Sequence, residues 1–262
     1  MSDVKLMQGD CLELMKQIPD NSVDMILCDL PYEVTAQNEW DKQLPLSKLW
    51  EQYNRITKDT SPIVLFSQGV FTAKLIFFNM SAFKYTLVWD KCLPSGFLNA
   101  NKQPLRTHED ICVFYYKQCT YNPQKIKGDA CHSRGNGVGN VGSGTNYGTY
   151  SMVETIGNDK FPGSILRYQK PHASVALHPT QKPVELLEYL IKTYTNEGDT
   201  VLDNCMGSGS TGVAAVNTNR NFIGIELDDE YFKTASDRIR LAQEHPDLQY
   251  KKPKPSDNKK LF

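Results

Sequence analysis

The chain has 262 residues, of which 40% are hydrophobic, and a formal net charge of -1. This size and apolar content suffice for one large globular domain, or for a domain that carries an insertion. No apolar run approaches the roughly 20 residues of a membrane-spanning helix, and the first residues lack the features of a signal peptide, so we expect a cytoplasmic protein without a membrane partner. Seven scattered cysteines without Cys-x-x-Cys spacing predict reduced thiols and no metal site.

The charge is unevenly distributed along the chain. Residues 84–170 carry 11 Lys and Arg against 6 Asp and Glu, and residues 245–262 carry 5 against 2. The remainder is therefore acidic. A basic middle in an acidic frame indicates that a polyanion binds the middle, although an accident of local composition remains the alternative.

The first third of the chain alternates apolar runs with amphipathic stretches, which is typical of an α/β fold. We expect strands at 4–7, 23–28, 61–66 and 84–89, and helices at 11–18, 46–56 and 70–79. Ligands bind outside the carboxyl ends of strands in such sheets. Asp10 follows the first strand and Asp29 ends the second, so both should lie at the same edge of the sheet.

The second strand ends in Asp29-Leu30-Pro31-Tyr32. Asp29 offers a carboxylate acceptor, Pro31 a carbonyl whose φ is fixed by the ring, and Tyr32 a flat face for stacking. Two acceptors beside an aromatic ring suit an amino group on a flat ring, such as the exocyclic amine of a nucleobase. A strand that simply ends in a turn with an exposed acid is the plainer interpretation.

The regular pattern weakens in the middle of the chain. Residues 91–106 are rich in Pro, Asn and Lys and predict a loop, before a strand over 108–117. From Gly128 to Gly148, seven of 21 residues are glycine, with basic residues inside and beside the run. Such a segment cannot form a core of its own. It is either a flexible surface loop or a mobile basic loop that a partner orders.

Order returns with a helix predicted over 184–194 and a strand over 200–203. A glycine-rich turn follows at 204–211, then a helix from Gly212, a strand over 221–225 that ends in Glu226, and a helix over 228–242. A tight glycine turn lets a ligand approach the backbone, and an acid at the end of the next strand can accept both hydroxyls of a ribose. This pair predicts a nucleoside site.

Two other classes of protein compete with this interpretation. Gly207-x-Gly209-x-x-Gly212 matches the dinucleotide fingerprint, so a nicotinamide-dependent oxidoreductase is one rival. This interpretation gives no function to Asp29 to Tyr32, and it does not explain the basic, glycine-rich run from Gly128 to Gly148. A non-enzymatic nucleic-acid-binding protein is the other rival, and it leaves the nucleoside pocket unused.

The motifs together resemble the β class of DNA amino-methyltransferases, which methylate N6 of adenine or N4 of cytosine. The resemblance covers nearly the whole chain, with the catalytic motif first and the cofactor glycines last, as in that class. It is carried by Gly9-Asp10-Cys11, Asp29-Leu30-Pro31-Tyr32, Trp89-Asp90-Lys91, His108-Glu109, His178 to Pro183, and Asp203 to Ala215.

The resemblance implies a Rossmann-like, mostly parallel sheet of the S-adenosylmethionine-dependent methyltransferase type, in permuted order, with an inserted target-recognition region. Its parts would be a catalytic half over 1–118, a target-recognition insertion over 119–170, a cofactor-binding half over 171–244 and a basic tail over 245–262, which its composition predicts to be disordered. The resemblance further implies that the enzyme methylates N6 of a flipped adenine in double-stranded DNA.

The resemblance also assigns residues to roles. The catalytic group would be Asp29, Pro31 and Tyr32. The cofactor S-adenosylmethionine would be bound by Asp10, Cys11, His178, Lys182, Asp203, Gly207, Ser208, Gly209, Ser210, Thr211 and Glu226. Phosphates would be held by cations of the basic middle, namely Lys91, Arg106, Lys125, Lys127 and Arg134.

Two departures from the family's pattern stand out. Leu30 replaces the usual first proline of the catalytic segment, which should matter little. Asn204-Cys205 replaces a usual Pro-Phe, so a smaller side chain would lie against the cofactor. Adenine is favoured over cytosine because cytosine-N4 members more often carry serine at the position of Asp29. The resemblance also allows for a homodimer, for a restriction endonuclease that acts on the same site, and for a bacterial or phage source.

Overall fold

The computed structural model describes residues 2–31, 44–128, 158–170 and 181–245. Tyr32, Arg134, His178, the tail from residue 246 and residues 129–148 of the glycine-rich run lie outside this part of the chain. The chain divides into two compact units, one formed by Met1–Asn122 with Ser164–Phe262 and the other by Pro123–Gly163. Within the described ranges, no helix is long and apolar enough to cross a membrane.

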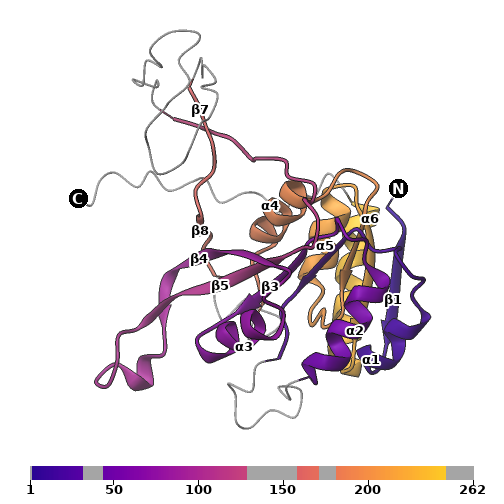
Figure 1. The fold of residues 1–262 in the computed structure, drawn as a ribbon, viewed down its shortest axis with the longest axis horizontal. Helices are drawn as coiled ribbons and strands as arrows, with labels where there is room; N and C mark the ends of the chain where they lie inside the picture. Colours follow the sequence, from indigo (N-terminus) through magenta and orange to yellow (C-terminus); the bar gives the residue numbers. More distant parts are fainter. Residues whose placement is uncertain (1, 32–43, 129–157, 171–180, 246–262) are drawn as a thin grey trace. The chain divides into compact units, whose positions relative to one another are not determined.

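The first unit is built on an eight-stranded sheet with the order β1-β10-β9-β2-β3-β5-β4-β8 (Figure 1). Its strands are β1 (Val4–Gln8), β2 (Met25–Cys28), β3 (Ile63–Ser67), β4 (Phe83–Ser95), β5 (Arg106–Phe114), β8 (Ile165–Arg167), β9 (Thr200–Asp203) and β10 (Asn221–Glu226). The five strands from β1 to β3 in this order are parallel, β5 is antiparallel to both β3 and β4, and β8 is parallel to β4. This mostly parallel α/β sheet confirms the predicted fold class.

The order of the strands explains where a site can form. Strands β2 and β9 come from opposite ends of the chain but pair directly, with Met25 opposite Val201 and Ile26 opposite Leu202. After β2 the chain continues to β3 on one side of this pair, and after β9 it continues to β10 on the other side. The pair β2–β9 is therefore the point at which the strand order reverses. Ligands of doubly wound sheets bind at such a switch point, beyond the carboxyl ends of the strands.

Helices cover both faces of the sheet. Strand β2 is buried throughout, and its side chains alternate: Ile26 and Cys28 join one apolar core, whereas Met25 and Leu27 join the other. Residues of α1, α2 and α3 pack in the first core, and residues of α4, α5 and α6 in the second. The bounds are α1 (Cys11–Leu14), followed by the 3-10 turn η1 (Met15–Gln17), α2 (Leu46–Ile56), α3 (Val70–Phe78), α4 (Val184–Tyr194), α5 (Ser210–Asn217) and α6 (Asp229–Glu244).

Helix bounds follow the local signals closely. Helices α2 and α4 begin and end where the sequence predicts, since both carry a regular apolar face. Asp10 caps α1 by accepting the N–H of Leu12 at 2.7 Å, and Asp228 caps α6 by accepting the N–H groups of Glu230 and Tyr231.

The segment after Trp89 differs from the expected loop. Strand β4 continues to Ser95, and only residues 96–105, with the short turn η2 (Phe97–Asn99), connect it to β5. The ladder shifts register between Asp90 and Ser95, where Cys92 has a φ of 59°. A bulge of this kind accommodates Pro94, which has no N–H for the ladder, so a proline-containing stretch stays within a strand.

The second unit contains a two-stranded antiparallel ribbon of β6 (Ile126–Lys127) and β7 (Asp159–Lys160). Lys127 forms an ion pair with Asp159, and the ammonium group of Lys125 lies 4.8 Å from the ring centre of Phe161. The unit falls inside the region predicted as the target-recognition insertion, over 119–170. Strand β8, at the end of that region, belongs to the large sheet.

Candidate active site

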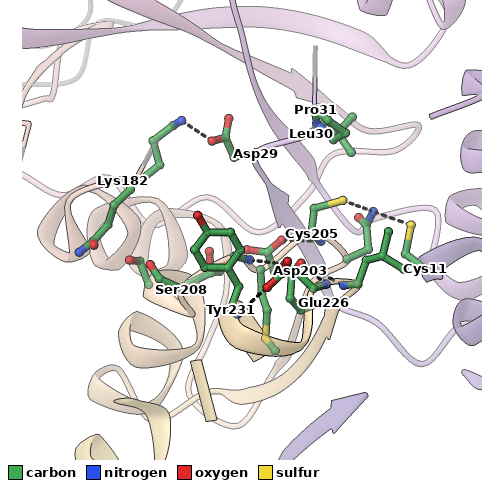
Figure 2. A pocket seen from close by; sticks show the side chains of 18 of the residues that line it. Cys11, Asp29, Leu30, Pro31, Lys182, Asp203, Cys205, Ser208, Glu226 and Tyr231 are labelled. Carbon is green, nitrogen blue, oxygen red and sulfur yellow. Dashed lines mark hydrogen bonds and ion pairs between the residues drawn. The ribbon is translucent and has the colours of Figure 1, made fainter. Parts of the chain in front are cut away.

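A cavity of about 870 Å³ opens at the carboxyl ends of the parallel strands. The N-terminal half of the chain lines it with residues that include Asp29, Leu30 and Pro31, which follow β2. The other half contributes residues at the ends of β9 and β10 and just beyond them, including Asp203 to Ser208, Ser210, Thr211 and Glu226 to Tyr231. Figure 2 shows Asp29 and Pro31 on one side of this space and Asp203, Cys205 and Glu226 on another. The strand order therefore joins two motifs that are distant in the sequence.

A network of four charged side chains lies along one wall of the cavity. The Lys182 ammonium group is 2.5 Å from Oδ2 of Asp29 and 3.4 Å from Oε2 of Glu109. Lys91 reaches the other oxygen, Oε1 of Glu109, at 3.3 Å. Asp29 and Lys182 point toward each other in Figure 2. The side chain of Lys182 also lies over the rings of Phe66 and Trp89, at 5.0 Å and 5.8 Å from their centres.

The network balances two carboxylates against two ammonium groups in a buried setting. Burial opposes the charge of Lys182, but Asp29 and Glu109 outweigh it and raise the pKa of this lysine. Burial likewise opposes the charge of Glu109, yet Lys182 and Lys91 hold its pKa below the usual value. Lys91 is 3% exposed, and burial lowers its pKa despite Glu109. The shifts of Lys182 and Glu109 therefore both favour the charged forms, whereas the shift of Lys91 disfavours its charge.

The glycine turn lies across the cavity from this network and is held by Glu226. One oxygen of Glu226 accepts the N–H of Gly207 at 2.7 Å, and the other accepts the N–H groups of Leu227 and Asp228 at 3.0 and 2.9 Å. Gly207 and Gly209 have φ values of 50° and 79°, which other residues rarely adopt. Arg238 of α6 donates to the carbonyl of Ser208 at 2.5 Å and supports the turn from behind.

Thiol, amide and carboxylate groups form the floor between the two motifs. The amide group of Asn204 accepts from the Tyr53 hydroxyl at 2.6 Å and donates to the sulfurs of Cys11 and Cys205 at 3.6 and 3.4 Å. Asp203 accepts the N–H of Cys205 at 3.1 Å. Burial raises the pKa of Cys28, behind this floor, to about 12, so it remains a thiol. Among the described residues, no group of His, Cys, Asp and Glu is arranged to hold a metal ion.

The region around the glycine turn is acidic. Five carboxylates line the cavity there, namely Asp203, Glu226, Asp228, Asp229 and Glu230. The described lining of this region includes no lysine or arginine. The pyrophosphate of a dinucleotide would meet this negative charge directly, whereas a cationic ligand is attracted by it. The arrangement therefore argues against the nicotinamide alternative that the glycine spacing allows.

The structure brings most of the predicted site residues to this one cavity. The residues that line it are Asp10, Cys11, Asp29, Pro31, Lys91, Arg106, Lys182, Asp203, Gly207, Ser208, Ser210, Thr211 and Glu226. Gly209 shapes the turn but is not part of the lining. Lys125 and Lys127 belong to the second unit. Tyr32, His178 and Arg134 lie outside the described residues.

Two predicted roles need restating from these positions. Lys182, expected at the cofactor, directs its ammonium group at Asp29 and Glu109. Lys91, expected on phosphates, is buried against Glu109. Sequence reasoning also missed Glu109, Arg238 and Tyr231 as parts of the site. Only Glu109 gave a signal, because His108-Glu109 is among the segments that carry the family resemblance.

Comparison with known proteins gives an independent result. The family model described as DNA methylase matches residues 23–237. The DNA adenine methyltransferase YhdJ of Escherichia coli K12 is 27% identical over 260 residues, which cover 92% of this chain and 84% of that protein. The type II methyltransferase M.HpaI of Haemophilus parainfluenzae is 28% identical over 255 residues, or 90% of this chain and 74% of that protein.

Solved structures show the same fold. The complex of M1.HpyAVI with SAM has a TM-score of 0.63 at 25% identity and covers 91% of this chain and 100% of that one. The cytosine-N4-specific PvuII DNA methyltransferase has a TM-score of 0.65 at 17% identity, with coverage of 95% and 91%. These likenesses span both halves of the cavity.

Proposed function

The chain belongs to the DNA methylase family, and we propose that it transfers a methyl group from S-adenosylmethionine to N6 of adenine in double-stranded DNA. The observation that carries this proposal is the cavity itself, in which Asp29 and Pro31 face the same space as the acidic glycine turn. An acceptor group for an exocyclic amine and a nucleoside site are thus placed within reach of each other.

The residues around the turn fit S-adenosylmethionine. When bound, this cofactor supplies an electrophilic methyl group on a positively charged sulfonium. Asp203 and the acids near Glu226 provide the negative charge that attracts a cation, and the positive φ of Gly207 leaves room for close approach. Glu226 would receive the ribose hydroxyls while it holds the turn through backbone N–H groups. Asp10 and Cys11 lie at the same edge for the adenine.

Asp29 would act on the target amine. The lone pair of an exocyclic amine is delocalised into the base, so acceptors that hold its N–H groups redirect the lone pair toward the methyl group. The Asp29 carboxylate and the Pro31 carbonyl are the two acceptors, and Tyr32 supplies the stacking face. Because the ammonium group of Lys182 binds Oδ2 of Asp29, the carboxylate is held in one orientation at the edge of the cavity. Lys182 is thus a positioning residue.

Adenine is supported over cytosine by two observations. The residue at the head of the catalytic segment is Asp29, not the serine more common in cytosine-N4 members. Among the relatives, YhdJ is named as a DNA adenine methyltransferase. The likeness to the cytosine-N4-specific PvuII enzyme, at 17% identity, concerns the fold alone.

Mass spectrometry of nucleosides tests the product. Unmethylated plasmid DNA is incubated with the protein and S-adenosylmethionine, digested and analysed, with an Asp29→Ala variant as the inactive control. We expect N6-methyladenine with the wild type and none with the variant. N4-methylcytosine without N6-methyladenine would refute the adenine assignment and leave the enzyme class intact. If RNA in a parallel reaction is methylated and the DNA is not, the DNA substrate is refuted as well.

The biological setting is also part of the proposal. We infer that the enzyme acts in the cytoplasm of a bacterial cell, on the chromosome or on phage DNA, and that a restriction endonuclease of the same specificity accompanies it. M.HpaI is named as a type II methyltransferase, which supports this pairing. Light scattering with and without DNA tests whether the chain forms the homodimer that the resemblance allows.

A further inference from the structure

The hairpin of β4 and β5 ends in a tip, residues 96–105, that exposes adjacent apolar side chains. Phe97 is 81% exposed and Leu98 is 95% exposed. Single exposed apolar residues are ordinary, but here Leu93 and Leu105 are also exposed on the same hairpin, at 44% and 38%. No described residue of the chain covers this cluster. Figure 1 shows the hairpin projecting well beyond the helices that cover the sheet.

The tip begins where the wall of the cavity ends. Ser95 and Arg106 form the last pair of the hairpin ladder, and both line the cavity. Lys91 donates to the Ser95 hydroxyl at 3.1 Å, and that hydroxyl donates to the carbonyl of Arg106, also at 3.1 Å. Arg106 in turn binds Gln68 at 2.5 Å. The base of the tip is therefore connected by hydrogen bonds to the charged network that orients Asp29.

Charge identifies the partner that this tip fits. The tip and its base, residues 96–106, contain two cations, Lys102 and Arg106, and no acid. A basic segment with apolar side chains at its end suits a polyanion whose interior is apolar, which describes a DNA duplex. A base can enter the cavity only from a duplex held over the rim, and such a duplex would lie beside the tip.

Base flipping leaves a gap that must be filled. Moving one nucleotide out of the stack costs unpairing and unstacking, and proteins that distort DNA often insert Phe or Leu between base steps. The Phe97 ring and the Leu98 side chain have the right chemistry, and Gly96, with a φ of 87°, lets the chain turn sharply ahead of them. Their exposure in the protein alone is then explained by a surface that DNA covers.

We propose that the hairpin tip is a wedge, in which Phe97 and Leu98 enter the base stack beside the target and hold the flipped base in the cavity. The inference rests on the proposed function, because it requires DNA with a base to be flipped. It assigns to this hairpin the step that precedes methyl transfer, whereas Asp29 and its neighbours serve the transfer itself.

The test compares duplexes that differ only in the cost of flipping. Sequencing of plasmid DNA methylated by the wild type first identifies the site. Synthetic duplexes then carry the target adenine opposite thymine or opposite an abasic position. We expect the Phe97→Ala/Leu98→Ala variant to lose on the order of 10- to 100-fold in methylation rate on the paired duplex and to recover most of it opposite the abasic position. Fluorescence of 2-aminopurine at the target should rise on binding for the wild type and stay low for the variant.

Phe77→Ala is the matched control, because Phe77 is 80% exposed on α3 and does not line the cavity. It should match the wild type on both duplexes. Equal losses of the wedge variant on both duplexes, or no loss on either, would overturn the wedge. A changed oligomeric state of the variant in light scattering would instead assign the tip to a second copy of the chain and also overturn it. Failure of the proposed function looks different, since the wild type itself would then methylate neither duplex.

Discussion

Lys182 joins two carboxylates inside the cavity, so a change at this position acts on Asp29 and Glu109 together. At 2.5 Å and 3.4 Å from them, its ammonium group both orients Asp29 and offsets the negative charge of the pair. Removing one partner of a buried ion pair leaves an uncompensated charge, which costs several kcal/mol. The effect should appear in catalysis because we propose that Asp29 binds the target amine.

We expect Lys182→Met to lower kcat by about 100-fold, because a misplaced acceptor can cost that much, while the Kd for S-adenosylmethionine changes little. Glu109 then keeps only one of the two lysines that lower its pKa, so its pKa rises. Glu109 is therefore protonated at a higher pH, and the acid limb of the pH–rate profile shifts to higher pH. Methylation rates measured from pH 5 to 9 give kcat and the pH profile, and calorimetry gives the Kd for S-adenosylmethionine.

Lys182→Arg should recover part of the rate, since it keeps the charge. The control is Lys192→Met on α4, where the lysine is 45% exposed and paired with Glu188 on the surface. A variant at Lys182 that loses cofactor affinity but keeps its kcat would show that the lysine serves the cofactor instead.

Asp203 shows how a binding site can oppose stability. The carboxylate is 3% exposed, and burial raises its pKa to about 6 despite hydrogen bonds from Thr211 and the Cys205 N–H. A pKa that is higher in the folded than in the unfolded chain favours folding at low pH, and this advantage is lost as the pH rises through about 4 to 6. At neutral pH the charged form therefore costs about 3 kcal/mol in the protein without cofactor.

We expect Asp203→Asn to raise the free energy of unfolding of the cofactor-free protein above pH 6 by up to about 3 kcal/mol, with no gain below pH 4. Urea unfolding at pH 4 and pH 8 measures the difference. The same variant should bind S-adenosylmethionine more weakly, because the charge that attracts the cation is gone. A gain in stability that is equal at both pH values would contradict the assigned cause.

At the scale of elements, the glycine turn depends on how closely α5 approaches its neighbours. A Cβ at Gly212, in the first turn of α5, would lie 2.3 Å from Cδ1 of Ile239 on α6 and 2.7 Å from the Phe222 ring on β10. The third glycine of the motif therefore serves packing between helix and strand, which keeps the turn over the cavity. A side chain there would push α5, and with it the turn, outward.

Gly212→Ala should lower the free energy of unfolding by about 1–3 kcal/mol through overpacking and also weaken cofactor binding. Chemical denaturation followed by circular dichroism measures the first effect. Gly163→Ala is the control, because a Cβ there meets nothing within 4 Å. Adding Ile239→Val to the Gly212→Ala variant should restore stability in part. If it does not, the clash with α6 is not the cause.

At the scale of the whole molecule, the division into two units separates the cavity from part of the surface that we propose for DNA recognition. The sheet and all cavity-lining residues belong to the first unit, while Lys125 and Lys127 belong to the unit formed by Pro123–Gly163. Strand β8 begins directly after this second unit and pairs with β4, so the unit can be exchanged without removing a strand of the sheet.

Replacing residues 123–163 by a flexible linker should leave the thermal unfolding and the cofactor affinity of the first unit nearly unchanged, while DNA binding weakens and site preference is lost. The salt dependence of binding should also become less steep, because phosphate contacts are removed. Fluorescence anisotropy at several salt concentrations measures this. Unchanged site preference would place recognition elsewhere, with the segment 91–106 as the next candidate.

The sequence by itself determined much of the fold, because its signals are local. The apolar period defined α2 and α4 to the residue, and the apolar runs with their acidic ends identified β2, β9 and β10. The glycine spacing marked the turn after β9. Composition predicted a loop for residues 91–106 but could not show that β4 continues to Ser95, since a bulge that admits proline depends on the partner strand.

Only the tertiary structure decided which of these residues meet. That Asp29 and the glycine turn line the same cavity follows from the direct pairing of β2 with β9, which no local pattern specifies. Lys182 precedes α4 and Glu109 lies in β5, and neither position indicates that one ammonium group would join Asp29 and Glu109. Such contacts arise from the order of strands and the burial of unlike charges together. Periodicity is a property of neighbours in the chain, whereas an ion pair between distant segments exists only once the sheet has formed.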